Sequence, residues 1–117
     1  MILLEEIKVI KFDDFQKVDM RIGTVTEAKP FPEARKPAIK LKIDFGDLGI
    51  KQSSAQITNR YEPEQIVGRQ VAAVVNFPPM RVAGYKSEVL VLGGMPAPED
   101  VVLLTPDKPV ENGTKIG

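Results

Sequence analysis

The stretch Ile39-Lys40-Leu41-Lys42-Ile43-Asp44-Phe45 decides the fold of this chain. Large apolar residues occupy every second position, and charged residues occupy the positions between them. Successive side chains of a β-strand point to opposite faces, so this pattern predicts a half-buried strand with one wet face. Two of the three side chains on the wet face, Lys40 and Lys42, are basic. The pattern therefore predicts a sheet that covers a core on one side and presents positive charge on the other.

The segments on either side of this strand predict two neighbouring strands. Downstream, Gly46-Asp47-Leu48-Gly49 is a turn sequence that leads into residues 50–53, which predicts a hairpin. Upstream, residues 20–27 form the first strand, which ends at Pro30 and Pro32 because proline cannot donate a ladder hydrogen bond. A loop over residues 29–37 joins the first strand to the second.

The second half of the chain predicts one helix followed by further strands. Helix-forming residues at 54–60 and 63–67, with Ser54 as the N-cap, end at Gly68. Runs rich in β-branched residues indicate buried strands at 71–77, 88–92, the latter closed by Gly93-Gly94, and 101–104. Three shorter features complete the order: a helical turn that begins at Asp13 or Asp14, an irregular basic loop at 78–86, and a turn at Asn112-Gly113.

Three strands, a helix and two further strands follow the order of the OB-fold, an all-β, five-stranded Greek-key barrel. With 117 residues, the chain is predicted to form a single domain. We expect an N-terminal extension over residues 1–13, a barrel core over 14–94 and a C-terminal extension over 95–117. In this fold, the face of the second and third strands and the first and fourth loops bind oligonucleotides or oligosaccharides.

Composition argues against catalysis and against metal binding. The chain has no Cys and no His, which removes thiolate nucleophiles, imidazole acid–base chemistry and the usual zinc ligands. We therefore expect a binding protein with no cofactor and no metal, rather than an enzyme. The start Met1-Ile2-Leu3-Leu4 runs into Glu5 and Glu6 and resembles no secretory leader, and the apolar run 71–75 is too short to insert into a membrane. These features predict a cytoplasmic protein.

Charge is unevenly distributed although the formal net charge is zero. Residues 29–42 contain five basic side chains against one acidic one, whereas residues 99–111 contain four acidic side chains against one basic one. Clustered cations neutralise phosphates, so the basic half favours a polyanionic ligand. The predicted contacts are Arg35, Lys36, Lys40, Lys42, Arg81 and Lys86, with Gln52 and Ser53 as hydrogen-bond donors.

Several of these residues also have a purely structural interpretation. Lys40 and Lys42 could simply solvate the wet face of a strand, and Ser54 could donate to phosphate or sugar instead of capping a helix. The aromatic residues allow two roles as well. Phe31 and Phe77 fit packing at the end of the barrel better than stacking on bases, and Tyr85 fits either role.

Three motifs give the chain a resemblance to the tRNA-binding domain family, which includes the C-terminal appendage of some methionyl-tRNA synthetases and small bacterial export-related chaperones. The motifs are Asp19-Met20-Arg21-Ile22-Gly23, residues 51–58 (KQSSAQIT) and residues 76–92 (NFPPMRVAGYKSEVLVL), and the resemblance covers residues 14–117. It implies an OB-fold, a homodimer built with the help of segments outside the barrel, and recognition of tRNA by shape. Residue by residue, it implies tRNA contacts at Arg35, Lys36, Asn76, Arg81, Lys86 and Ser87. Met80 departs from the pattern, because relatives tend to have a basic residue there.

Three functions remain open at this stage. The first is recognition of folded tRNA through basic loops, with contacts to phosphates and 2′-hydroxyls. The second is a protein-export chaperone that binds unfolded preproteins and works with the export machinery. Its groove would be lined by Phe77, Met80 and Tyr85, with Phe31 nearby. The third, binding of oligosaccharides, is weaker because such sites seldom need clustered cations.

Overall fold

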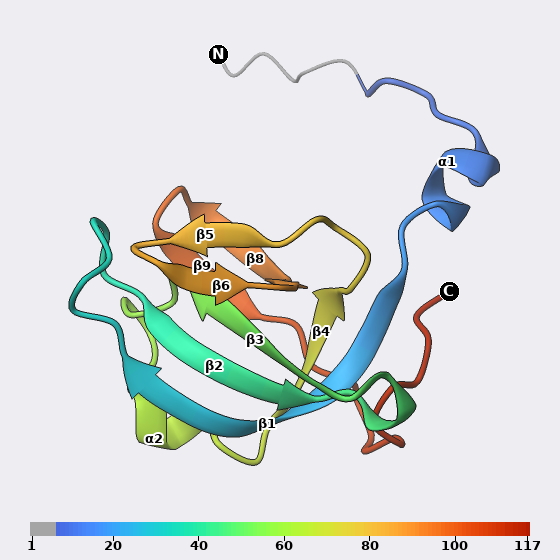
Figure 1. The fold of residues 1–117 in the computed structure, drawn as a ribbon. Helices are drawn as coiled ribbons and strands as arrows, with labels where there is room; N and C mark the ends of the chain where they lie inside the picture. Colours follow the sequence, from blue (N-terminus) through green and yellow to red (C-terminus); the bar gives the residue numbers. More distant parts are fainter. Residues whose placement is uncertain (1–6) are drawn as a thin grey trace.

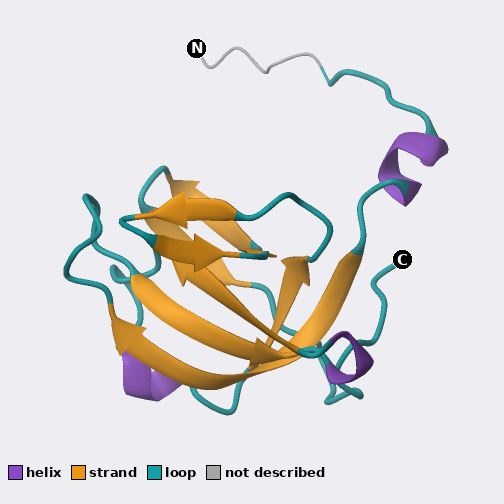
Figure 2. Ribbon diagram, in the orientation of Figure 1, coloured by secondary structure: helices purple, strands orange, loops and turns teal. Residues whose placement is uncertain are grey.

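The computed structural model describes residues 7–117 and consists mainly of antiparallel strands (Figures 1 and 2). The expected absence of a leader, and the first part of the expected extension 1–13, fall on residues 1–6 and lie outside the described residues. The elements are α1 (Phe12–Gln16), β1 (Met20–Pro30), β2 (Ile39–Asp44), the 3-10 turn η1 (Gly46–Leu48), β3 (Ile50–Ala55), α2 (Pro63–Ile66), β4 (Gln70–Val74), β5 (Met80–Val82), β6 (Tyr85–Ser87), β7 (Leu90–Val91), β8 (Gly93–Ala97) and β9 (Asp100–Leu103).

The main sheet has the strand order β3-β2-β1-β4-β7 and curls into a nearly closed barrel (Figure 1). The long strand β1 makes this possible, because a bulge between Val25 and Glu27 bends it. Its first half pairs with β4 and its second half pairs with β2. Hydrogen bonds link the edge strand β3 across the opening, among them those from Ser53 Oγ to the Val89 carbonyl and from the Glu88 N–H to the Gln52 carbonyl. The predicted all-β OB-type barrel is confirmed.

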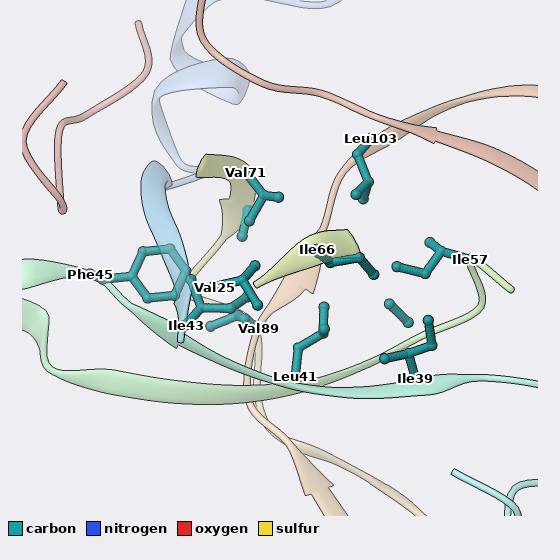
Figure 3. Packing of buried hydrophobic residues seen from close by; sticks show 12 residues of the cluster. Val25, Ile39, Leu41, Ile43, Phe45, Ile57, Ile66, Val71, Val89 and Leu103 are labelled. Atoms are coloured by element: carbon teal, nitrogen blue, oxygen red, sulfur yellow. The ribbon is translucent and has the colours of Figure 1, made fainter. Parts of the chain in front are cut away.

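The core lies inside this barrel and follows the predicted alternation of the second strand (Figure 3). Ile39, Leu41, Ile43 and Phe45 are each at most 1 % exposed. A Cβ at Gly23 would approach the Ile43 and Phe45 side chains to 2.7 Å, so a glycine in β1 is what allows the Phe45 ring to lie against this strand. Ile66 of the predicted helix α2 is fully buried and belongs to the same cluster.

The helix α1 and the C-terminal tail differ in their contact with the barrel. The predicted helical turn is present as α1, although it begins at Phe12 rather than at Asp13 or Asp14; the Asp14 carboxylate accepts a hydrogen bond from the Lys11 N–H at 3.1 Å. α1 and residues 7–11 before it project away from the barrel (Figure 1). The tail instead pairs with the first half of β1: the Ile22 N–H donates to Thr114 O, and the Ile116 N–H donates to Met20 O. Asn112 and Gly113 form the predicted turn.

Three sequence predictions are wrong in ways that matter for the site. Residues 54–60 are not helical, and Ser54 is not an N-cap, because β3 continues to Ala55 by pairing with β2. The expected irregular loop 78–86 contains the hairpin β5–β6. Gly93-Gly94 begins β8 rather than ending a strand, because both residues pair with β9. A Cβ at Gly93 would lie 2.5 Å from Val101 Cγ1 of β9, which explains the glycine there. Along residues 7–117, no helix reaches the length and apolarity that crossing a membrane requires.

Candidate nucleic-acid interface

The hairpin β5–β6 forms one wall of the site and is built on a two-residue turn. Ala83 and Gly84 both have positive φ, at 47° and 81°, which is the backbone that a tight hairpin turn with right-handed twist requires. Contacts with the barrel hold β6 in place. The Ser87 hydroxyl accepts a hydrogen bond from the Ser54 N–H at 3.1 Å, and Gln52 Nε2 donates to the Lys86 carbonyl at 3.0 Å.

A groove of about 750 Å³ lies between this hairpin and the loop that joins β1 to β2. Three segments far apart in the sequence line it, at residues 34–38, 54–56 and 77–90. Several of its apolar side chains are open to solvent: Phe77 is 50 % exposed, Met80 67 % and Leu90 50 %. A hollow of this size with an apolar lining and a few polar groups is the usual form of a ligand site.

Cations rim the groove. Arg35 and Lys36 come from the loop after β1, and Arg81 comes from β5, against the single carboxylate of Glu88 among the lining residues of the described chain. Lys86 is the cross-strand partner of Arg81, so the two side chains share one face of the hairpin. Like charges placed directly opposite each other are destabilising. An anion bound at this face would offset that repulsion.

The cluster Lys40–Phe31–Tyr85 lies beside the groove and has a structural role. Lys40 Nζ lies 4.7 Å from the centroid of the Phe31 ring and 5.1 Å from that of Tyr85. The two rings meet edge to face at 5.5 Å, and the Tyr85 hydroxyl donates to the Leu41 carbonyl at 3.3 Å. Burial, and then the carboxylates of Glu27 and Glu88, raises the pKa of Tyr85. Phe31 is 3 % exposed, so packing rather than stacking on a base explains it.

Lys42 lies on the predicted wet face and forms an ion pair there. Its Nζ is 3.3 Å from Glu27, which also pairs with Lys29 at 2.9 Å. Hydrogen bonds from Lys29 and then from Lys42 lower the pKa of Glu27. Lys40 and Lys42 thus have partners on the barrel, although Lys42 is itself exposed. Arg35, Lys36 and Lys86 are exposed at loop and hairpin positions.

The polar residues predicted to bind tRNA also divide into two groups. Ser53 is 1 % exposed, and its hydroxyl donates to the Val89 carbonyl inside the barrel, so it faces away from any ligand. Asn76 joins the ends of two strands, because its amide accepts from the Asp19 N–H and donates to the Lys17 carbonyl. Gln52 holds the hairpin through Lys86. Of the predicted polar set, Ser87 lines the groove.

Sequence reasoning missed Gln56 and Leu90, which also line the groove. Both were assigned to regular elements, Gln56 to a helix and Leu90 to a buried strand, and neither has a chemical signature of its own. Leu90 could have been suspected from the strand pattern, because it alternates with the buried Val89 and must point outward. Nothing in the sequence signals Gln56.

Comparison with known proteins places this geometry in a family. The family model described as "Putative tRNA binding domain" matches residues 20–115. That range contains the whole barrel, the basic loop and the hairpin. The chain belongs to the tRNA-binding domain family.

Two groups of relatives were found. The chain is 40 % identical over 108 residues to the methionine–tRNA ligase of Methanococcoides burtonii and 40 % identical over 107 residues to that of Bdellovibrio bacteriovorus. Each alignment covers 92 % of this chain, but the chain spans 16 % and 15 % of the length of those enzymes. The chain therefore matches one part of an enzyme, and the family description names tRNA binding rather than a reaction.

Solved structures resemble the chain over most of its length. The chaperone CsaA from Bacillus anthracis is 64 % identical with a TM-score of 0.91, covering 94 % of this chain and 100 % of its own. CsaA from Picrophilus torridus is 51 % identical with a TM-score of 0.86, covering 93 % of this chain and 100 % of its own. The expected likeness to a chaperone of this family is confirmed, since both of these neighbours are CsaA structures.

Proposed function

We propose that this chain is a non-catalytic, CsaA-like protein that binds folded tRNA through the rim of the groove. The cations are Arg35, Lys36 and Arg81, which line the groove, and Lys86, the cross-strand partner of Arg81. The observation that carries the proposal is that two segments more than forty residues apart, a loop and a hairpin, bring Arg35, Lys36 and Arg81 to one hollow. Membership of the tRNA-binding domain family supports tRNA as the ligand.

The proposed contacts are made to the sugar–phosphate backbone. Guanidinium and ammonium groups on the rim neutralise phosphates, and side chains such as Gln56 and Ser87 reach 2′-hydroxyls or phosphate oxygens. Contacts of this kind read the shape of a folded RNA rather than its base sequence. Lys40, Lys42, Gln52, Ser53 and Asn76 support the surface from behind instead of contacting the ligand.

We also propose that two copies act together as a homodimer. Apolar side chains lie exposed outside the groove, among them Phe12 of α1 at 70 %, Met95 of β8 at 63 % and Leu104 after β9 at 49 %. Burying such side chains against a second copy would remove apolar surface from water. A dimer would present two basic rims to one RNA. The proposed location is the cytoplasm, where tRNA is found.

The test is a titration of the protein with bulk folded tRNA over a range of salt concentrations, comparing the native chain with Arg35→Ala/Lys36→Ala. Each lost phosphate contact reduces the slope of log K against log salt by roughly 0.7 to 0.9. The double variant should therefore bind more weakly at low salt and show a slope lower by about 1.5. Binding can be followed by filter retention or by fluorescence anisotropy of labelled tRNA.

The matched control is Lys17→Ala/Lys108→Ala, which removes the same charge from two exposed positions outside the groove. It should leave the slope almost unchanged. Equal loss of slope in both variants would show that bulk charge drives binding and would refute a localised site. Absence of tRNA binding by the native chain at low salt would refute the proposal outright.

A second candidate function is that of a chaperone for unfolded preproteins, and one observation favours it. The groove has an apolar part that is open to solvent, with Phe77, Met80 and Leu90 at least half exposed. Phosphates gain nothing from such side chains, whereas an unfolded polypeptide does. The name of the chaperone CsaA, a structural relative, points the same way. Contact with the export machinery would follow from that role.

A further inference from the structure

We propose that tRNA and an unfolded polypeptide segment compete for the groove, so that binding of one releases the other. This inference rests on the proposed binding of tRNA at the rim. Its new content is that the apolar floor and the cationic rim belong to one hollow, lined by the same hairpin and the same loop. A ligand on the rim therefore covers the floor, and a ligand on the floor occupies the rim.

The floor suits a short extended polypeptide that carries large apolar side chains. Met80 and Leu90 offer flexible aliphatic surface, and Phe77 offers an aromatic ring. The unbranched thioether side chain of Met80 adapts to side chains of different shape, which suits a binder of many sequences. The hollow of about 750 Å³ is large enough for several side chains rather than one.

The rim specifies the charge of that polypeptide. Arg35, Lys36 and Arg81 surround the apolar floor, and Glu88 is the single acidic lining residue along the described chain. Charge complementarity across an interface favours the opposite sign and disfavours the same sign. The occupant is therefore an apolar segment flanked by aspartate or glutamate, because a segment flanked by lysine would be repelled.

Competition follows because the same cations serve both ligands. A cation that contacts a phosphate cannot contact a carboxylate at the same time, and the floor is reached between these cations. Arg81 is fixed by a hydrogen bond of 3.2 Å from its Nη1 to the Gly84 carbonyl, which holds it over the hairpin turn rather than leaving it free to swing away. When two ligands exclude each other, each lowers the apparent affinity of the protein for the other by the same mechanism. At a tRNA concentration of ten times its Kd, the apparent Kd of the peptide should rise by about tenfold.

The experiment uses a short dye-labelled peptide in which leucine and phenylalanine alternate, with an aspartate at each end, and bulk folded tRNA as the competitor. Peptide anisotropy is measured as tRNA is added, at low salt, on the native chain. We expect full displacement, with a midpoint set by the Kd of tRNA measured separately. The same peptide with a lysine at each end should bind at least about tenfold more weakly, as expected from the loss of favourable charge contacts and the gain of repulsive ones.

Variants separate the floor from the rim. Met80→Ser/Leu90→Ser should weaken peptide binding by about tenfold or more, because apolar contact is lost. It should leave tRNA affinity within about twofold of the native value, because no phosphate contact is lost. The matched control is Ile50→Ser/Val67→Ser, which alters side chains of similar exposure (60 % and 48 %, against 67 % and 50 %) outside the groove and outside the proposed dimer contact. It should leave peptide binding unchanged.

The outcomes distinguish this inference from the proposed function. Retention of the peptide on a tRNA-saturated protein would overturn the competition while leaving tRNA binding intact. Failure of the peptide to bind, or equal losses in the floor variant and its control, would overturn it as well. Failure of tRNA to bind in the arm without peptide would refute the proposed function itself, and the competition with it.

Discussion

The strands β2 and β3 and the strands β5 and β6 are both antiparallel hairpins, yet they contribute differently to this molecule. The first pair is joined by six register pairs, and its residues Ile39, Leu41 and Ile43 are each at most 1 % exposed. The second pair has three register pairs, and Met80 is 67 % exposed. The difference shows that the barrel supplies a rigid support, whereas the groove is built on a hairpin that adds little to the core.

The two hairpins also differ in their turns. The turn between β2 and β3 places glycines at both of its positive-φ positions, Gly46 and Gly49. The turn between β5 and β6 places an alanine, Ala83, at φ 47°. A non-glycine residue in this region is strained, and such strain is found most often at functional sites. The strained turn is thus at the edge of the groove, and the relaxed turn is at the far end of the barrel support.

The largest predicted effect is the loss of stability when a buried side chain of the barrel core is truncated. Ile43→Ala should lower the free energy of unfolding by about 2–5 kcal/mol, because it opens a cavity among fully buried side chains. Met80→Ala, at the groove, should change it by less than about 0.5 kcal/mol. Urea denaturation of both variants measures the difference. Similar losses in the two variants would mean that the hairpin is as much a part of the core as β2.

A smaller loss of stability is predicted for Ser53, which the sequence assigned to the binding site but which the structure places inside the barrel. Ser53→Ala removes a buried hydrogen bond of 2.9 Å to the Val89 carbonyl and should cost about 1–2 kcal/mol of stability. Because Ser53 faces inward, the salt slope of tRNA binding should stay the same. Urea denaturation and the tRNA titration together test this. A reduced salt slope of tRNA binding with unchanged stability would show that Ser53 contacts tRNA after all.

The smallest effect is predicted at the strained turn. Ala83→Asn creates the Asn-Gly pair that this turn type prefers, and it should stabilise the hairpin by roughly 0.5–1 kcal/mol. Hydrogen exchange of the β5 and β6 amides should slow by about twofold to fivefold, while exchange in β2 stays the same. Ala83→Val is the opposing control, because a β-branched residue tolerates positive φ poorly. Faster exchange in the asparagine variant would contradict the prediction.

Much of the fold could be predicted, because in strands such as β1 and β2 the local sequence pattern agrees with the tertiary environment. The alternation in residues 39–45 predicted β2 correctly, and the prolines after Lys29 marked the end of β1. The segment 54–60 could not be predicted in the same way. Its residues have helical propensity, but pairing of Ser54 and Ala55 with β2 overrides that preference. The hairpin β5–β6 was hidden by the prolines before it and by an alanine in place of the usual turn residue.

The sequence by itself determined the barrel and the positive charge of residues 29–42. A period of two and a cluster of cations can both be seen without knowing what lies nearby. The tertiary structure decided which of those cations are free. Lys42 is paired with Glu27 and Lys40 is held over two rings, whereas Arg35 and Arg81 meet across a groove. Such distinctions depend on residues far apart in the chain that folding brings together, and no local pattern contains them.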